Sequence, residues 1–274
     1  MKYILIIYFI ILIIDNVYGY GYKVHEYMGK IVDDYILINE EKLKKKINIK
    51  FEDVSSWADK IKRNKKYEWT KELHYIDIYE CINKKYDEEI INKYCKDNCI
   101  IYSIKELTKL LKHSNKNNIF YKQENTDIYI NNNNNKFEIL NNEEKLKLLI
   151  HFIQDFSQPL HLLGYKRGGN DYKVKILYNG YNTTRNLHYI WDSLIPEYFI
   201  NKTKYKREKI YYYNEKDYNK LVDNVFNKNI NISCKIYPDK DYLIFEEYYN
   251  EKYMEELFNN YMELIIKTLK YIYE

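Results

Sequence analysis

Apolar residues recur at three- and four-residue spacing along much of this chain, and few residues interrupt that spacing. The 274 residues include only seven glycines and three prolines, the residue types that most readily break a helix. Such spacing places apolar side chains on one face of a helix, which can then pack against other helices. The sequence therefore predicts a mainly helical, all-α fold. The clearest helices are expected over residues 24–36, 104–111, 143–163 and 251–272.

One short stretch departs from helical spacing. Residues 172–178 alternate polar and apolar side chains and lead into Asn179-Gly180, a dipeptide typical of a two-residue hairpin turn. At most a small hairpin is expected there, and no alternation of strands with helices suggests a parallel sheet. We expect one compact helical bundle over residues 20–274, a length sufficient for one sizeable core.

The first 19 residues have the features of a secretory signal peptide. Lys2 precedes an apolar run over residues 4–14, and Val17-Tyr18-Gly19 supplies small or modest side chains at a cleavage site. The alternative is a membrane anchor, but this run falls well short of the roughly 20 apolar residues that span a bilayer. We therefore expect cleavage after Gly19 and a soluble, secreted protein without stable membrane insertion.

Cysteine usage agrees with that compartment. Cys81, Cys95, Cys99 and Cys234 form an even set, which in a secreted chain favours two disulfides over free thiols. Four cysteines allow three pairings. Cys95 and Cys99 would close a short loop at little entropic cost, which leaves Cys81 and Cys234 as a long-range bond. A zinc site built from these thiols is the alternative, but their spacing lacks the usual paired two-residue gaps.

The overall composition says less about function than the cysteines do. The net charge of +4 is small beside 44 basic and 40 acidic side chains, so it indicates neither a strong polyanion binder nor an acidic tail. Asn182, Asn201 and Asn231 fit the glycosylation acceptor pattern. The asparagine run over residues 131–135 and the lysine-rich residues 202–209 are expected to be insertions without an assigned role.

Histidine and aspartate carry the chemistry. Five of the six histidines fall in a fixed order with four aspartates, and imidazole nitrogen and carboxylate oxygen are ligands that zinc accepts. Nine such groups are enough for more than one ion. The series is His25, Asp59, His74, Asp77, His151, Asp155, His161, His188 and Asp192.

Helical geometry brings some of these groups together. At about 100° per residue, Asp155 lies about 40° and His161 about −80° from His151, within one arc. His188 and Asp192 repeat the four-residue spacing. One such pair is often only a surface hydrogen bond, and a lone histidine on an apolar face is usually a core residue. Two pairs with a third histidine favour a metal site.

A further ligand is expected at the processed amino terminus. If the mature chain starts at Tyr20, its α-amino nitrogen and carbonyl oxygen can close a five-membered ring on a metal, with His25 nearby. The amino group has a pKa near 8 in its free form, so a cation readily displaces its proton.

The order of these segments resembles the zinc-dependent single-strand-specific nucleases and 3′-nucleotidases of the S-one/P-one or mung bean nuclease type. Their superfamily also contains the zinc-dependent bacterial phospholipases C. The resemblance extends from Tyr20 to about Cys234. It rests on Ser56-Trp57-Ala58-Asp59, Leu73-His74-Tyr75-Ile76-Asp77, His151-Phe152-Ile153-Gln154-Asp155 with Gln158-Pro159-Leu160-His161, Gly168-Gly169-Asn170, and Asn186-Leu187-His188 before Trp191-Asp192.

This resemblance implies a trinuclear zinc cleft. The first ion would be held by Asp59, His74, His151 and Asp155. The second would be held by Tyr20 main-chain atoms, His25 and a bridging Asp155, and the third by His161, His188 and Asp192. It also implies a water activated between the first two ions, and the disulfides Cys81 with Cys234 and Cys95 with Cys99.

The same resemblance assigns the substrate contacts. Lys62 would stabilise the transition state, with Arg63 as the alternative and a plain solvated lysine as the other interpretation. Tyr75 would stack on a base whose edge Asp77 binds, unless Tyr75 is simply a core aromatic. Asn170 would shape the same pocket, although Gly168-Gly169 is also explained by a turn alone.

The implied activity is hydrolysis of single-stranded DNA and RNA to 5′-phosphate products, with 3′-nucleotidase activity, by a protein that we expect to be a monomer. Two departures from the family pattern are Tyr20 in place of tryptophan and Val24 in place of glycine. The alternatives are a zinc phospholipase C, which typically has glutamate where this chain has Asp192, and a non-catalytic secreted protein whose zinc only supports the fold.

Overall fold

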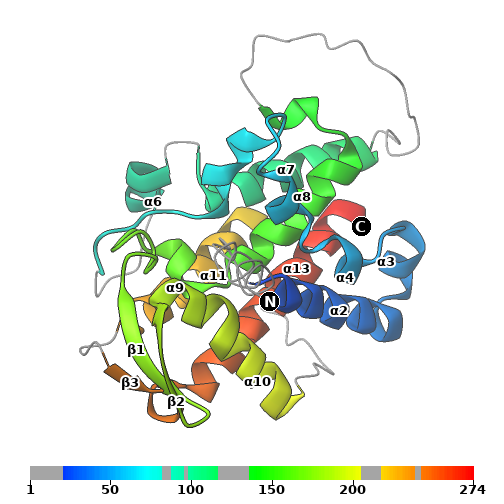
Figure 1. Ribbon diagram of the computed structural model, residues 1–274. Helices are drawn as coiled ribbons and strands as arrows, with labels where there is room; N and C mark the ends of the chain where they lie inside the picture. The colour runs from blue at the N-terminus through cyan, green and yellow to red at the C-terminus, as the bar shows by residue number, and fades with distance from the viewer. Residues whose placement is uncertain (1–20, 82–87, 96–97, 117–135, 205–216, 238–241) are drawn as a thin grey trace, which may run out of the picture.

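The computed structural model describes residues 21–81, 88–95, 98–116, 136–204, 217–237 and 242–274. Tyr20, the asparagine run at 131–135 and most of the lysine-rich 202–209 segment lie outside these residues. Helices dominate the described chain (Figure 1), as the sequence predicts. In chain order the elements before the hairpin are α2 (Tyr22–Asn39), α3 (Glu41–Lys46), α4 (Phe51–Val54), α5 (Trp57–Ile61), η1 (Glu68–His74), α6 (Glu88–Cys95), α7 (Ile100–Lys116), η3 (Lys136–Ile139), α8 (Asn142–Asp155) and η4 (Pro159–Leu162).

The second half begins with the hairpin and ends in the longest helix. Its elements are β1 (Lys173–Tyr178), β2 (Tyr181–Asn186), α9 (Leu187–Tyr189), the π-helical turn η5 (Ile190–Leu194), α10 (Ile195–Thr203), α11 (Tyr218–Ser233), β3 (Tyr242–Ile244), α12 (Phe245–Tyr248) and α13 (Glu251–Tyr273). The predicted helices over 24–36, 104–111 and 251–272 are confirmed within α2, α7 and α13.

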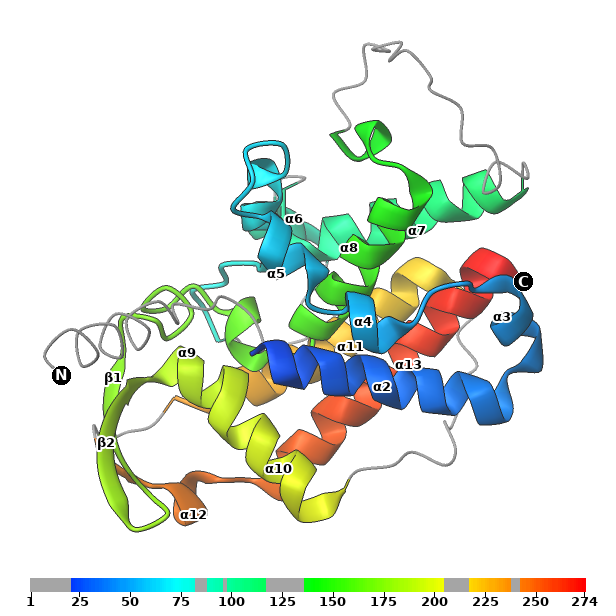
Figure 2. The ribbon, with the colours of Figure 1, turned by 45° about the vertical axis from the view of Figure 1, so that its right-hand side comes forward.

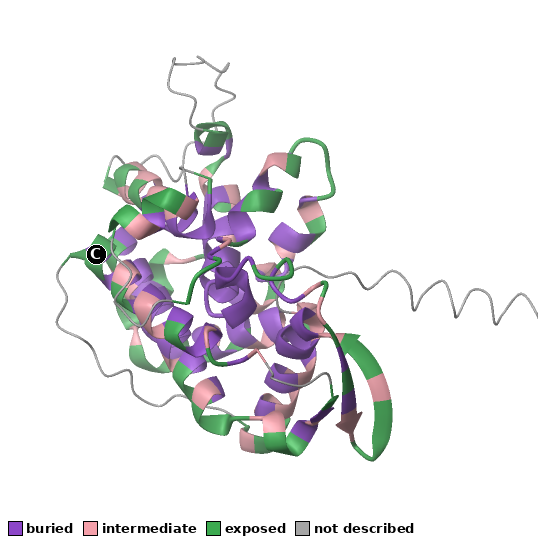
Figure 3. Cartoon of the chain, turned by 90° about the vertical axis from the view of Figure 1, so that its left-hand side faces the viewer, coloured by how far each residue is buried: buried purple, intermediate pink, exposed green. Residues whose placement is uncertain are grey.

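Helix α8 is central to the core. It packs against α7, α5, α13 and α2, and α13 in turn packs against α11 and α7. Nearly every residue of α8 from Lys145 to Asp155 is buried, and Figure 3 shows buried residues filling the middle of the helical body. The helix begins at a capping box in which Asn141 accepts from the Glu144 backbone and Glu144 accepts from the Asn141 backbone. A buried helix with a fixed start can position side chains accurately.

The predicted helix over 143–163 is too long. Helix α8 ends at Asp155, and a separate 3₁₀ turn, η4, starts at Pro159. Gln158 adopts an extended conformation, with φ −85° and ψ 116°, because the proline ring disfavours helical geometry in the residue before it. His161 therefore lies on a different element from His151, and the angle computed along one continuous helix is wrong for it.

The hairpin forms where Asn179-Gly180 predicts it. Both residues have positive φ, 49° and 78°, as a type I′ turn requires, and Tyr178 pairs with Tyr181 across it. The sheet has one strand more than the sequence predicts, because the three-residue β3 pairs with β1 in parallel. A strand this short leaves no recognisable alternation. Figure 2 shows the hairpin at one side of the helical body.

Two disulfides brace the described chain. Cys81 is bonded to Cys234 and Cys95 is bonded to Cys99. These are the pairings that the family resemblance implies. Among the described residues, no helix combines the length and the apolar character needed to cross a bilayer.

The two disulfides should contribute unequally to stability. Their cysteines are 153 and 4 residues apart, for which the chain-entropy model gives about 5 and about 2 kcal/mol respectively. We expect the double variant Cys81→Ser/Cys234→Ser to lower the urea midpoint of unfolding more than Cys95→Ser/Cys99→Ser does. Equal losses would show that unfolded-chain entropy does not control their contribution.

Candidate metal centre

Eight predicted ligand side chains converge on one buried region from elements distributed over much of the chain. All eight are at most 4% exposed. His25 comes from α2, Asp59 from α5, His74 from η1, His151 and Asp155 from α8, His161 from η4, His188 from α9 and Asp192 from η5. They form three groups whose ligand atoms lie within 4.8 Å of one another: His25 with His151 and Asp155; Asp59 with His74 and His151; His161 with His188 and Asp192.

Asp155 joins the first two groups. Its Oδ2 lies 3.1 Å from His151 Nε2 and 2.8 Å from His74 Nδ1, and its Oδ1 lies 3.4 Å from His25 Nε2. His151 Nε2 is also 3.6 Å from Asp59 Oδ1. These distances place imidazole nitrogens from three elements around one carboxylate, which could therefore bridge two cations, and His151 belongs to both groups.

The third group adjoins the first two. His161 Nδ1 lies 3.8 Å from Asp155 Oδ2, and the His161 ring stacks on the His188 ring with centroids 5.2 Å apart. His188 Nε2 lies 3.2 Å from Asp192 Oδ2, although their four-residue spacing crosses from α9 into the wider π-helical turn η5. π-Helical turns are frequent at functional sites because they redirect side chains.

Hydrogen bonds fix the orientation of four imidazoles. The Nδ1–H groups of His151, His161 and His188 donate to main-chain carbonyls of Ser55, His74 and Gly168 at 2.7, 2.8 and 2.6 Å. His25 Nδ1–H donates to the side chain of Gln154 at 2.6 Å. In each ring the donor is Nδ1, so the lone pair of Nε2 faces the cluster. Outer hydrogen bonds of this kind are a common feature of histidine ligands.

Two glutamines in this outer layer were not predicted as site residues. Gln154 binds His25 and also donates to Ser55 Oγ at 2.9 Å. Gln158 donates to Asp192 Oδ1 and accepts from the Leu160 backbone. Both are fully buried, and a glutamine beside Asp155 in an otherwise apolar helix is the signal that points to such a role, because buried amides need partners.

Burial favours the uncharged form of these ligand side chains, which suits metal binding by His74 and His188 but opposes the ionisation that a carboxylate ligand needs. Burial lowers the pKa of His74 and of His188 to about 3, chiefly because the charged imidazolium loses its hydration. Both rings are therefore neutral near pH 7. Burial likewise raises the pKa of Asp192 well above its usual value. Burial also opposes ionisation of Asp155, but the nearby His151 and His161 outweigh it and lower the pKa of that carboxyl.

Ligand atoms without hydrogen-bond partners show that these groups fit a metal ion. Buried polar atoms almost always have hydrogen-bond partners, yet one side-chain atom on each of six ligand residues has none among the described residues. These atoms are Asp59 Oδ2, His74 Nε2, Asp155 Oδ1, His161 Nε2, His188 Nε2 and Asp192 Oδ2. All six can donate an electron pair to a cation, so the three groups could hold metal ions.

The predicted substrate residues share a cleft with these groups. The cleft has a volume of about 600 Å³ and is lined by Lys62, Tyr75, Asp77 and Asn170 together with Asp59, His74, His161 and His188. Lys62 Nζ lies 2.5 Å from Asp59 Oδ1, and Arg63 lines the cleft beside it. Burial raises the pKa of the half-buried Asp77. Asp77 belongs to none of the three groups.

A left-handed turn positions His188. Residues Lys166, Arg167, Gly168 and Gly169 have consecutive positive φ values of 49°, 51°, 59° and 80°. This conformation directs the Gly168 carbonyl toward His188 Nδ1. A Cβ at Gly168 would lie 2.7 Å from the Leu160 carbonyl oxygen, closer than real contacts allow. The lack of space therefore requires glycine at Gly168, and its positive φ further favours glycine there.

Substituting this glycine should weaken the third group. We expect Gly168→Ala to reduce metal affinity by about 10- to 100-fold, the usual effect of losing an outer partner of a ligand. Chelator competition on the purified protein measures it. Gly180→Ala is the matched control, since Gly180 also has positive φ but has open space around its Cβ position. Equal metal affinity in both variants would contradict the role of the Gly168 carbonyl.

The chain is similar in sequence to known proteins over much of its length. The chain is 31% identical to Endonuclease 4 of Arabidopsis thaliana over 71% of its residues. It is 28% identical to Nuclease S1 of Aspergillus oryzae over 66% and 27% identical to Nuclease P1 of Penicillium citrinum over 54%. The matched segments cover 61%, 55% and 45% of those relatives' own lengths, so the chain matches about half of each. The S1/P1 nuclease family model matches residues 20–270, nearly the whole sequence. This chain belongs to the S1/P1 nuclease family.

Proposed function

We propose that this protein is a zinc-dependent endonuclease that hydrolyses phosphodiester bonds in single-stranded DNA and RNA, leaves 5′-phosphate products and also acts as a 3′-nucleotidase. One observation carries the proposal: three histidine and aspartate groups converge beside a cleft that Lys62, Tyr75, Asp77 and Asn170 also line. Metal ligands and groups suited to a nucleotide therefore meet in one place. The family relationship supports the same function.

The donor chemistry favours zinc. Every ligand is an imidazole nitrogen or a carboxylate oxygen, and the two histidines with a pKa of about 3 are neutral as zinc requires. Three ions would be held by the side chains of the three groups, with main-chain atoms of Tyr20, outside the described residues, completing the set that contains His25 and Asp155. Gly21 N–H donates to the Asp192 carbonyl at 3.0 Å, which anchors the first described residue beside this site.

When bound, zinc ions supply a nucleophilic water at neutral pH and a positive field for the charge that develops on phosphate oxygens. The protein contributes orientation and charge of its own. Asp155 lies between the first two groups and can keep their ions close together. Lys62 is only 8% exposed and lies against Asp59, so its ammonium group can stabilise the added negative charge of the transition state.

The base would lie against Tyr75. Its ring is 36% exposed and lines the cleft, where a base could stack on it, and Asp77 lines the same cleft. Asn170 lines the same cleft and donates its amide to the Arg167 carbonyl at 3.0 Å, which orients its side chain. Because a base within a duplex cannot reach such a ring, the arrangement favours unpaired strands.

The proposed location is the secretory route or the cell exterior. Two disulfides persist in oxidising compartments and are rare in the cytosol, and the first 19 residues have the composition of a secretion signal. We further propose that the protein acts as a monomer, because the cleft and the metal groups are all built from one chain.

Metal removal tests the proposal. We expect a chelator to abolish hydrolysis of single-stranded DNA and RNA and added zinc to restore it, because the cleft residues alone supply no activated water. Product ends and release of phosphate from 3′-nucleotides are followed in parallel, with phosphatidylcholine as the alternative substrate. Hydrolysis of the lipid alone would favour a phospholipase C, and no zinc-restored hydrolysis of either would favour a structural role for the metal.

Asp155→Asn tests the bridging carboxylate. The amide keeps the shape of the side chain but removes the charge between the first two groups, so we expect activity to fall by more than the roughly 100-fold typical of an outer-shell loss. Secretion and fold should be largely retained, as measured by yield and circular dichroism. Asp223→Asn is the control, since Asp223 pairs with Lys105 away from the site. Normal turnover by Asp155→Asn would exclude the bridging role.

A further inference from the structure

The segment after η1 presents three side chains to the cleft in alternation. Tyr75, Asp77 and Tyr79 all line the cleft, whereas Ile76 and Ile78 between them are at most 1% exposed. This is the period of two expected when every second residue of a chain faces the core. We refer to residues 75–79 as the cleft wall. Tyr79, 66% exposed, is the wall residue to which the proposed function assigns no role.

The cleft wall is fixed to the segment that carries His161. Ile76 N–H donates to the His161 carbonyl at 2.8 Å, and Gly164 N–H donates to the Ile78 carbonyl at 2.9 Å. Ile78 and Leu163 form a parallel bridge. The wall is therefore held in register with a metal-ligand segment, and its side chains keep a constant distance from the metal groups.

The ring of Tyr79 is supported in place although it is exposed. A Cβ at Gly164 would lie 2.6 Å from Tyr79 Cζ and 2.9 Å from Asp77 Cβ, so both side chains rest directly on the glycine backbone. The Tyr94 ring of α6 lies behind, with centroids 6.5 Å apart and a tilt of 45°. An exposed aromatic ring held from two sides offers a face to a ligand without the entropy cost of ordering it.

We propose that Tyr79 is a second base-stacking position, which binds a nucleotide of the same strand whose scissile nucleotide lies against Tyr75. The proposal rests on the proposed nuclease function and specifies how much of the strand is recognised. Residues 75 and 79 are at most about 13 Å apart along an extended chain, and a turn at Asp77 shortens this. That span equals roughly four stacked nucleotides, or fewer in a strand drawn out across the wall.

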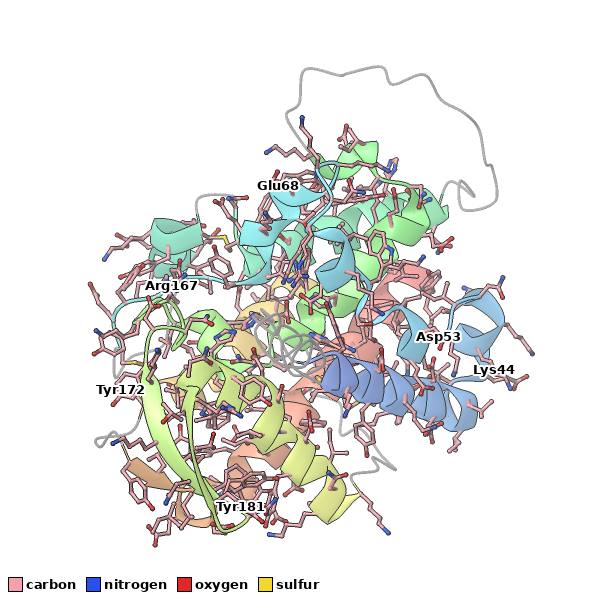
Figure 4. All side chains as sticks on the ribbon, in the orientation of Figure 1. Lys44, Asp53, Glu68, Arg167, Tyr172 and Tyr181 are labelled. Atoms are coloured by element: carbon pink, nitrogen blue, oxygen red, sulfur yellow. A yellow bond between two sulfur atoms is a disulfide. The ribbon has the colours of Figure 1, made fainter. Side chains whose placement is uncertain are left out.

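The charges around the wall fit a strand that crosses it. Lys71 and Arg167 line the same cleft as Tyr79, as does Arg63 beside Lys62. The lining also includes the acidic Asp59, Glu72 and Asp77. Lys71 and Arg167 form exposed ion pairs with Glu68 and Asp171, which a phosphate group can compete for. Basic side chains interleaved with aromatic rings are the usual design for binding single strands without base preference. In Figure 4 the labelled Arg167 lies beyond one end of the hairpin, well away from Tyr181 at its other end.

The proposal predicts an effect that depends on substrate length. A 3′-mononucleotide can occupy only the Tyr75 position, whereas a tetranucleotide can reach Tyr79. We expect Tyr79→Ala to lower kcat/KM for a tetranucleotide by about 5- to 100-fold, the range found on removing a ring that stacks on a base. Hydrolysis of the 3′-mononucleotide should stay within twofold of the parent protein.

The affinity of the zinc-loaded protein for a tetranucleotide gives a second test of the proposal. Fluorescence anisotropy with a slowly cleaved, phosphorothioate-linked tetranucleotide should show the same loss of affinity for Tyr79→Ala. Tyr79→Phe and Tyr79→Trp should retain the affinity, because stacking needs the ring and not the hydroxyl group. The matched control is Tyr181→Ala, since Tyr181 is 77% exposed at the far end of the hairpin, where it pairs with Tyr178.

The possible results separate the two proposals. A parent protein that hydrolyses none of these substrates overturns the nuclease function itself. A parent protein that hydrolyses them, with Tyr79→Ala unchanged on the tetranucleotide, overturns the second stacking position alone. Equal losses on the mononucleotide and the tetranucleotide also overturn it, because they would show that Tyr79 only supports the shape of the Tyr75 pocket.

Discussion

Burying a carboxylate in a protein costs free energy unless positive charge or hydrogen-bond donors face it. The arrangement of the site depends on how the protein compensates for the burial of Asp155. This residue ends the central helix α8 and is fully buried. His25 and His74 approach it from two other helical segments, and His151 from one turn back along α8. The helices thus meet around a polar centre, which lies within the apolar core and borders the cleft lined by Asp59, His74 and His161.

Backbone carbonyl groups and buried side chains share the task of holding the ligands in place. Carbonyl groups of Ser55, His74 and Gly168 orient three of the imidazoles. One of these residues, His74, is itself a ligand, so its main chain orients His161 while its ring joins a different group. The three groups are therefore coupled through the fold, and a shift in one loop changes more than one of them. Ligands that are far apart in the sequence therefore depend on the same core for their relative positions.

Short-range patterns in the sequence predicted much of this arrangement. The pairs His151 with Asp155 and His188 with Asp192 lie together because four residues make about one helical turn, and the hairpin forms because Asn179-Gly180 suits a type I′ turn. His161 lies at the site as predicted, but on η4 and not on a continuation of α8, because the helix ends before Pro159. Residues 75–79 alternate polar and apolar side chains, and Gln154 is a polar residue beside Asp155, but neither pattern indicates which segment each contacts. Those partners, and the pairing of strand β3 with β1, depend on contacts between distant segments, which no local pattern encodes.

The disulfides have a consequence that goes beyond thermal stability. Cys81 lies two residues after Tyr79, and its bond to Cys234 ties the end of the cleft wall to the end of α11. At the other end, Ile100, next to the bonded Cys99, donates its N–H to the Tyr75 carbonyl at 3.1 Å. Each end of the wall is thus secured by a neighbouring covalent bond. Formation of the two disulfides therefore also constrains the wall that we propose binds a strand, and a reduced chain would have a less constrained cleft even if its metal-binding groups were assembled.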